Sequence, residues 1–258
     1  MIRLKTTEEI ETLKIGGERH ALILKKLEAM VAPGLSTFKL EEEARRLIAE
    51  YGDEASFLGY RPDGANRDFP AALCVSINEE IVHGIPNEKE RFLQEGDIVT
   101  LDLGITHNSL ITDSAITVPV GEVSEEVQKL LKVTKEALNR GIEQAKPGNH
   151  VGDIGFAISK VVSASGFSIA RGLAGHGVGY DVHEDPFVPN YSNPGEGDEL
   201  VPGLVIAIEP MVSIGKSAIK VLNDGYTIRT GDGSLSAHFE HTVAITPKGN
   251  IVLTAYRD

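Results

Sequence analysis

The sequence predicts a mixed α+β protein whose second half repeats the element order of its first half. Apolar residues recur at helical spacing twice in each half, and short β-type apolar runs follow each pair of helices. A Pro-Gly break separates the helices in both halves, at Pro33-Gly34 and at Pro147-Gly148. We therefore expect one domain with an internal duplication, with halves of residues 1–121 and 122–258 related by an approximate two-fold axis.

The first half begins with two helices and continues with strands. Apolar or small residues at helical spacing predict a helix over residues 10–31. Ser36 or Thr37 can cap a second helix that reaches residue 51. The strands are expected at residues 72–77, 98–105 and 110–120.

The second half has the same order of predicted elements, two helices followed by strands. Helices are expected over residues 127–142 and 151–162, followed by strand-like runs at 201–214, 218–228 and 238–245. Gly203 precedes Glu209 by six residues, just as Gly96 precedes Asp102 by six. This repeated spacing places a carboxylate in an apolar run of each half.

Composition limits the classes of function. The chain has 258 residues, 41% of them apolar and 24% charged, and its formal net charge is −13. This charge opposes binding to anionic membranes and to nucleic acid, so we expect no sequence-specific nucleic-acid partner. Cys74 is the single cysteine, which excludes an internal disulfide framework and fits a reducing compartment. We expect a cytoplasmic protein, because the sequence has neither a signal-peptide pattern nor about 18 consecutive apolar residues.

The carboxylates in the apolar runs are the first chemical signal. Asp102 and Glu209 lie in the most apolar segments, where an isolated ionised carboxylate is costly. The simpler interpretation, without a functional role, is that each of these carboxylates ends a strand and faces solvent. A hairpin turning at residues 106–108 would, however, bring Asp102 and Asp113 to neighbouring strands, and Glu240 matches Asp113 in the second half. A bound metal is an economical source of the compensating positive charge.

Histidine adds to this carboxylate set. His176 lies between two glycines, which allow a close approach of the backbone, whereas His20, His107 and His150 are expected at the surface. Carboxylates with one imidazole suit Mn, Fe(II) or Co better than a structural zinc. Several bidentate carboxylates can hold two ions, so the residues by themselves indicate a dinuclear metal hydrolase.

Six segments together carry a family resemblance: residues 74–86, 96–102, 112–114, 175–186, 208–212 and 236–243. In this order and spacing they resemble the type I methionine aminopeptidases, over nearly the whole chain. The resemblance implies the pita-bread fold and a metallo-exopeptidase that removes the initiator methionine. It further implies hydroxide attack from a dinuclear metal centre, a nascent-chain or peptide substrate with N-terminal Met, a monomer, and transient association with the ribosome.

The resemblance also implies roles for individual residues. The metal ligands would be Asp102, Asp113, His176, Glu209 and Glu240, around two divalent ions (Co, Mn, Fe(II) or Zn), with Asp113 and Glu240 bridging. Glu209 would also move protons, and His83 and His183 would flank the scissile peptide. Cys74, Phe69 and Tyr226 fall on positions of the methionine pocket, and Tyr226 stands where the family commonly has Trp.

Two alternatives stay open. An Xaa-Pro peptidase of the same fold would share the metal ligands, although such relatives usually carry an additional N-terminal domain. A non-catalytic binding protein on this fold would be expected to lose ligands, and all five ligand positions are intact here.

Overall fold

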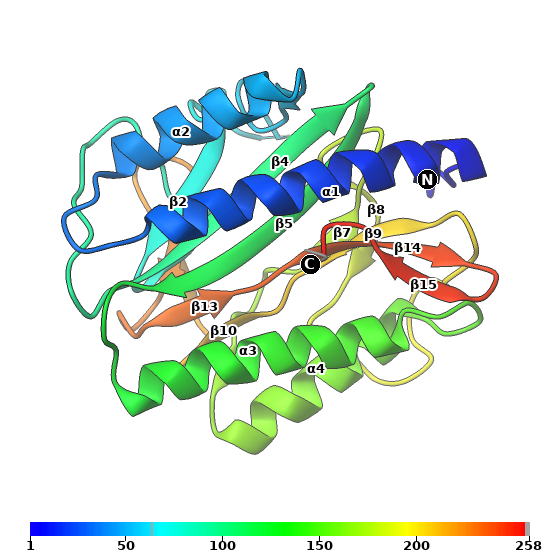
Figure 1. The fold of residues 1–258 in the computed structure, drawn as a ribbon. Helices are drawn as coiled ribbons and strands as arrows, with labels where there is room; N and C mark the ends of the chain where they lie inside the picture. The colour runs from blue at the N-terminus through cyan, green and yellow to red at the C-terminus, as the bar shows by residue number, and fades with distance from the viewer. Residues whose placement is uncertain (63, 256–258) are drawn as a thin grey trace.

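Two pairs of helices flank the strands in the computed structural model, which describes residues 1–62 and 64–255 (Figure 1). The helices are α1 (Thr7–Met30), α2 (Thr37–Glu50), α3 (Glu125–Gln144) and α4 (Val151–Ser165). The strands are β1 (Glu54–Ala55), β2 (Leu73–Ile77), β3 (Glu80–Val82), β4 (Ile98–His107), β5 (Leu110–Pro119), β6 (Ser168–Ile169), β7 (Gly175–Gly177), β8 (Glu184–Val188), β9 (Val205–Ile208), β10 (Met211–Ser213), β11 (Ile219–Val221), β12 (Ile228–Thr230), β13 (Ser236–His238), β14 (His241–Thr246) and β15 (Gly249–Val252). The mixture of helices and antiparallel sheets agrees with the α+β class that the sequence predicts.

Helices α1 and α2 begin where short polar side chains can satisfy free backbone N–H groups. Thr6 and Glu9 form a capping box at the start of α1, and the Ser36 hydroxyl accepts a hydrogen bond from the Phe38 N–H at the start of α2. Ser36 is therefore the N-cap of α2, and Thr37 is its first helical residue. No helix in the described part of the chain is long and apolar enough to cross a membrane.

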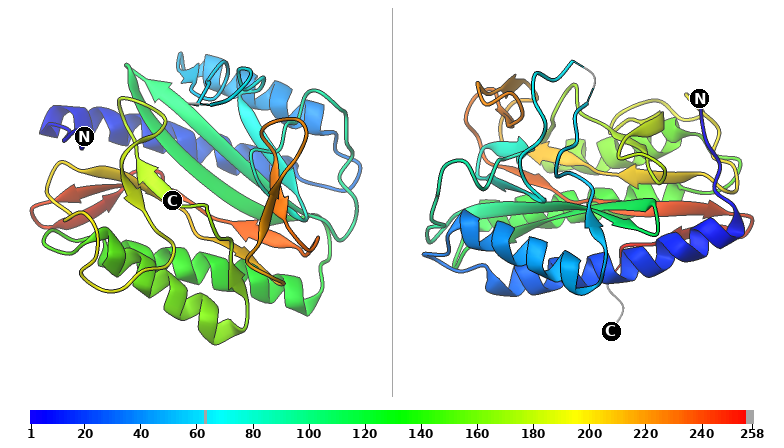
Figure 2. Two further views of the ribbon diagram at one scale, coloured as in Figure 1. Left: turned by 180° about the vertical axis from the view of Figure 1, so that it is seen from behind. Right: turned by 90° about the horizontal axis from the view of Figure 1, so that it is seen from above.

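The first sheet separates its apolar residues from its carboxylates by strand alternation. Strand β4 pairs antiparallel with β5, β2 and β1. Leu101 and Leu103 of β4 belong to the buried core that α1 and α2 build on one face (Figure 2). Asp102 lies between these two leucines, so its side chain faces away from the helices. Asp113 pairs with Gly104, and therefore shares the face of Asp102.

The second half breaks its strands at the carboxylates. The strand-like runs expected at 201–214 and 238–245 each include residues of two strands, separated by a break at the carboxylate. Glu209 lies between β9 and β10, where the following Pro210 has no N–H for a ladder hydrogen bond. Glu240 likewise lies in a break between two strands, β13 and β14. The run at 218–228 is a hairpin of β11 and β12 that carries Tyr226 in its turn.

Direct hydrogen bonds join the two halves. The Thr242 hydroxyl accepts from the Asp113 N–H at 2.8 Å and donates to the Asp113 carbonyl at 2.7 Å. The Glu240 N–H donates to the Ala115 carbonyl at 2.9 Å. These contacts hold β5 against the break between β13 and β14, so carboxylates of both halves meet at the junction.

Candidate metal centre and its cavity

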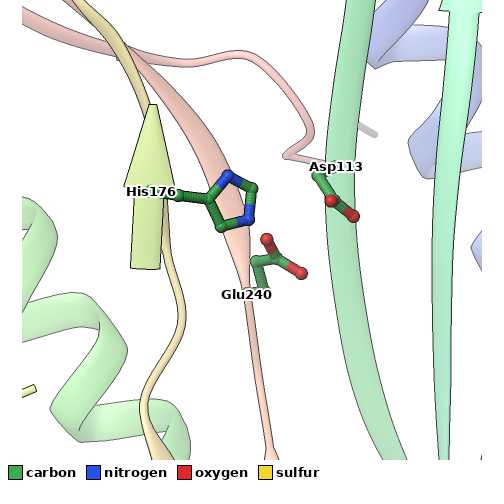
Figure 3. Close-up of side chains that lie close together, drawn as sticks. All are labelled: Asp113, His176 and Glu240. Carbon is green, nitrogen blue, oxygen red and sulfur yellow. The ribbon is translucent and has the colours of Figure 1, made fainter. Parts of the chain in front are cut away.

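Three side chains from three segments converge on one point in Figure 3: Asp113 from β5, His176 from β7, and Glu240 from the break between β13 and β14. Each offers a ligand atom, and these atoms all lie within 4.8 Å of one another. Asp113 and Glu240 are 4% and 2% exposed, the His176 side chain is 12% exposed, and the three residues lie far apart in the sequence. The tertiary structure thus assembles a compact oxygen-and-nitrogen donor set.

Glu209 and Asp102 lie beside this group of three. One carboxylate oxygen of Glu209, Oε1, is 3.4 Å from His176 Nε2. Asp102 faces the same side of the first sheet as Asp113, and the two residues are 6% and 4% exposed. The five residues that sequence reasoning selected as metal ligands therefore occupy one buried region, with Asp113, His176 and Glu240 the most tightly grouped.

The buried, closely spaced carboxylates of the cluster favour binding of a cation. Burial raises the pKa of Asp102, Asp113 and Glu240 above their ordinary values, and the charge of Glu209 raises the pKa of all three further. The His238 imidazole acts against this rise at Asp102. One oxygen of each of these residues is buried with no hydrogen-bond donor in the described part of the chain. Orphaned carboxylate oxygens in such numbers are expensive unless a positive group is bound, so the donor set fits a divalent metal.

His176 is held in the tautomer that leaves its Nε2 atom free to bind a metal. Its Nδ1 atom lies 2.9 Å from the Gly177 carbonyl, which can only accept, so Nδ1 carries the proton. The Nε2 lone pair is left facing the carboxylates. A metal-ligating histidine is commonly held in this way by a second hydrogen bond.

Backbone supports hold the cluster, and sequence reasoning missed them. Thr242 fixes both backbone polar groups of Asp113, and the Asn190 amide donates to the Glu209 carbonyl at 3.0 Å. Asn190 is 1% exposed and lies after β8, far from Glu209 in the sequence. Thr242 lies in the 236–243 segment that carries the family resemblance, whereas Asn190 lies outside all six segments. The residue pattern predicts the supporting role of neither.

A cavity of about 810 Å³ opens onto the cluster, and His83 and His183 line it. The His183 ring lies 4.4 Å from the His176 ring between centroids, and its Nδ1 is 2.8 Å from the Tyr60 hydroxyl. Burial lowers the pKa of His183 and brings that of His83 to about 4. His83 has a φ of 59°, a strained conformation of the kind found at functional sites. Tyr60 is a further cavity residue that sequence reasoning did not select.

The remaining predicted residues form an apolar wall of the same cavity. Phe69, Cys74 and Tyr226 all line it and belong to one buried cluster together with Val182. The Phe69 and Tyr226 rings meet edge to face at 5.1 Å. Burial raises the pKa of the Cys74 thiol, so Cys74 stays uncharged and contributes a small apolar surface.

Two histidines expected at the surface are buried, so that expectation is wrong for them. His20 is 0% exposed and its Nδ1 lies 3.1 Å from the Thr112 hydroxyl, because its helix face packs on β5. His107 is 8% exposed and contacts the Asp53 carboxylate at 2.7 Å. His150 is half-buried and precedes α4 as its N-cap.

Buried carboxylates and one imidazole face a partly apolar cavity, and this donor set fits a divalent metal of the kind that metal-dependent hydrolases use. Residues 11–247 match metallopeptidase family M24, and the chain belongs to this family. It is therefore a metallopeptidase that uses a divalent metal.

Similar proteins cover the chain from end to end. A methionine aminopeptidase of Aquifex aeolicus is 47% identical, with 98% of each chain covered. The crystal structure of methionine aminopeptidase from Thermotoga maritima superposes with a TM-score of 0.93 at 41% identity, covering 98% of this chain and 99% of that one. An Xaa-Pro dipeptidase from Bacillus anthracis shares the fold at a TM-score of 0.77 and 22% identity, with 99% of this chain and 62% of that chain covered. These likenesses confirm the expected pita-bread fold.

Proposed function

We propose that this chain is a methionine aminopeptidase that removes the N-terminal methionine from peptides and nascent proteins. The observation that carries the proposal is the Asp113, His176 and Glu240 cluster, placed at the end of a cavity with an apolar wall. The cavity wall has the character that a methionine side chain needs, since a thioether packs well against aromatic rings such as Phe69 and Tyr226. Support comes from the relatives named methionine aminopeptidase, which match this chain over nearly its full length.

The proposed ligands are Asp102, Asp113, His176, Glu209 and Glu240, holding two divalent ions among Co, Mn, Fe(II) and Zn. Such ions would supply Lewis acidity and an activated water at the scissile carbonyl. On the family resemblance, Asp113 and Glu240 are the proposed bridging ligands, and both belong to the tightest group. The orphaned oxygens of Asp102, Asp113 and Glu240 support this assignment.

The protein's own side chains bind and orient the substrate. Phe69, Cys74 and Tyr226 take up the methionine side chain, and the carboxylate cluster attracts the free α-amine of the substrate. His183 contacts the scissile carbonyl oxygen, and the Tyr60 hydroxyl orients its ring through Nδ1. His83 contacts the substrate amide from the other side, and Glu209 holds and releases protons next to the reacting bond.

We also propose that the chain is a single catalytic domain that arose by duplication of residues 1–121 and 122–258. Each half contributes a helix pair to its own buried core, one core with α1 and α2 and the other with α3 and α4. The carboxylates lie where the halves meet. On the family resemblance, we propose further that the protein works as a monomer in the cytoplasm, in transient contact with the ribosome.

The deciding experiment compares two substrates. The purified protein, loaded with Mn, Co or Fe(II), is expected to release methionine from the peptide Met-Ala-Ser, and EDTA is expected to stop the release. Preferential cleavage of an Xaa-Pro dipeptide would instead establish the prolidase alternative. Metal binding without cleavage of either substrate would establish a binding protein on this fold.

A further inference from the structure

A second imidazole lies against the carboxylate cluster, that of His238, which belongs to the 236–243 segment but has no role in the proposed mechanism. His238, at the end of β13, is 1% exposed. Both of its ring nitrogens are buried, and neither has a hydrogen-bond partner among the described residues. A buried, unpartnered imidazole is costly, so its position needs a physical explanation.

The ring is aimed at Glu209. His238 Nε2 lies 3.4 Å from Glu209 Oε2 and 3.9 Å from Glu240 Oε2. Glu209 Oε1 lies 3.4 Å from His176 Nε2, so the carboxylate stands between two imidazoles with one oxygen toward each. The distance from His238 Nε2 to Glu209 Oε2 is just beyond the usual N–H···O range of about 2.7–3.2 Å.

The backbone of His238 is fixed from two sides. Its N–H donates to the Thr117 hydroxyl at 2.9 Å, and the same hydroxyl donates to the His238 carbonyl at 2.7 Å. Across the sheet, His238 pairs with Met211, two residues after Glu209. The position of the ring next to Glu209 is therefore set by β5 and β10.

The two imidazoles that flank Glu209 differ in whether their Nδ1 atom has a hydrogen-bond acceptor. His176 donates its Nδ1 proton to the Gly177 carbonyl, which leaves Nε2 free to bind a metal. His238 has no acceptor for an Nδ1 proton in the described part of the chain. If His238 bound a metal through Nε2, its Nδ1–H would be a buried donor without a partner, at a cost of about 1–3 kcal/mol. A proton on Nε2 avoids this cost, because Glu209 Oε2 can accept it.

We infer that His238 is a positioning residue whose Nε2–H donates to Glu209 Oε2. This contact holds the second oxygen away from the metal position, so that Glu209 presents Oε1 beside His176. The inference rests on the proposed function in one respect, since it takes Glu209 as a metal ligand. Removal of the donor is expected to weaken metal binding and to slow the reaction without changing the methionine pocket.

The test compares two variants of similar size in the full-length protein. His238→Leu removes the donor, whereas His238→Gln keeps an amide N–H₂ that can reach the carboxylate. The Mn dissociation constant, measured by calorimetry without substrate, is expected to rise about tenfold in His238→Leu, as is typical for the loss of an outer partner of a metal ligand. We expect kcat to fall by a similar factor with KM within about twofold, and His238→Gln to recover most of both losses.

A matched control separates this effect from general destabilisation. His107→Leu also removes a buried imidazole, at the end of β4 where its partner is Asp53, and is expected to lower the melting temperature without changing the Mn dissociation constant. An unchanged Mn dissociation constant in His238→Leu would overturn the inference, and so would equal weakening in the His107→Leu control. Loss of one bound ion per chain in both His238 variants would make His238 a ligand instead.

A measurement on the wild-type protein keeps the inference testable even if the variants fold poorly. In the zinc-loaded protein, long-range ¹H–¹⁵N NMR spectra distinguish the two neutral tautomers of each histidine. His238 is expected to carry its proton on Nε2 and His176 on Nδ1. A His238 proton on Nδ1 would contradict the inference. Calorimetry and NMR do not depend on substrate, so a failure to release methionine would count against the proposed function alone.

Discussion

The ammonium group of Lys5 lies 2.7 Å from Oε2 of Glu184, and the two side chains are only 1% and 2% exposed. The other oxygen of Glu184 accepts hydrogen bonds from the N–H groups of Tyr180 and Asp181. Glu184 thus shapes the turn that presents His183 to the cavity. The backbone N–H of Lys5 also donates a hydrogen bond to the Gly203 carbonyl at 2.7 Å, so the segment before α1 is bonded to the second half of the chain.

Breaking this ion pair is expected to affect stability and catalysis together. Glu184→Gln leaves the Lys5 ammonium buried without its partner charge, which is expected to lower the free energy of unfolding by about 3–5 kcal/mol. We expect kcat to fall as well, because the turn before His183 loses its anchor. Lys5→Met combined with Glu184→Gln is expected to be more stable than Glu184→Gln alone. Urea unfolding of the two single variants and the double variant measures this coupling, and strictly additive losses would contradict it.

Asp113→Asn is expected to make the metal-free protein more stable while destroying activity. Burial and repulsion from its neighbours raise the pKa of Asp113, so a neutral amide relieves the cluster when no cation is bound. In EDTA the melting temperature is expected to rise, at about 2–4 °C for each kcal/mol gained. The additional rise on adding Mn is expected to shrink sharply, and methionine release to fall by more than about 100-fold, beyond the range for outer partners of a ligand. Wild-type turnover in this variant would remove Asp113 from the ligand set.

His183→Ala is expected to lower kcat while metal affinity stays near that of the wild type. The ring lies in the cavity next to His176, and its hydrogen-bond partner is the Tyr60 hydroxyl rather than the carboxylates. Tyr60→Phe is expected to act in the same direction by about tenfold or less, because the imidazole stays and only its orientation is freed. Steady-state kinetics with Met-Ala-Ser and calorimetry with Mn separate the two effects. Loss of bound ions in His183→Ala would identify His183 as a ligand.

Acid is expected to destabilise the protein partly through His20. Burial lowers the pKa of His20 from an ordinary 6.5 to about 3, so between these values the unfolded chain binds a proton that the folded protein does not. Stability that is present above pH 6.5 is therefore lost as the pH falls, by about 2 kcal/mol between pH 7 and pH 5. His20→Gln is expected to lose correspondingly less over this range. Urea unfolding at the two pH values, with Mn saturating, provides the measurement, and equal losses in both proteins would exclude His20 as the source.

Local patterns were sufficient for much of the fold. The helices came from the spacing of apolar residues, and Ser36 was recognised as a candidate cap because capping depends on neighbouring residues. The hairpin around 106–108 was predictable because β4 and β5 are adjacent in the sequence, and its register brings Asp102 and Asp113 to one face. The breaks at Glu209 and Glu240 were missed, because an apolar run does not reveal where a strand leaves one sheet for another.

By itself, the sequence determined which residue types were available for chemistry: carboxylates in apolar segments, His176 between glycines, and a small apolar set with Cys74. Only the tertiary structure decided which of these side chains contact one another. Lys5 reaches Glu184 across 179 positions, and His238 reaches Glu209 through the pairing of β13 with β10 rather than through proximity in the sequence. The physical reason is that burial and hydrogen bonding depend on distance in space. Packing of the chain brings Glu184 to the buried ammonium of Lys5 and Glu209 to the buried imidazole of His238, and the function of each buried group depends on that neighbour.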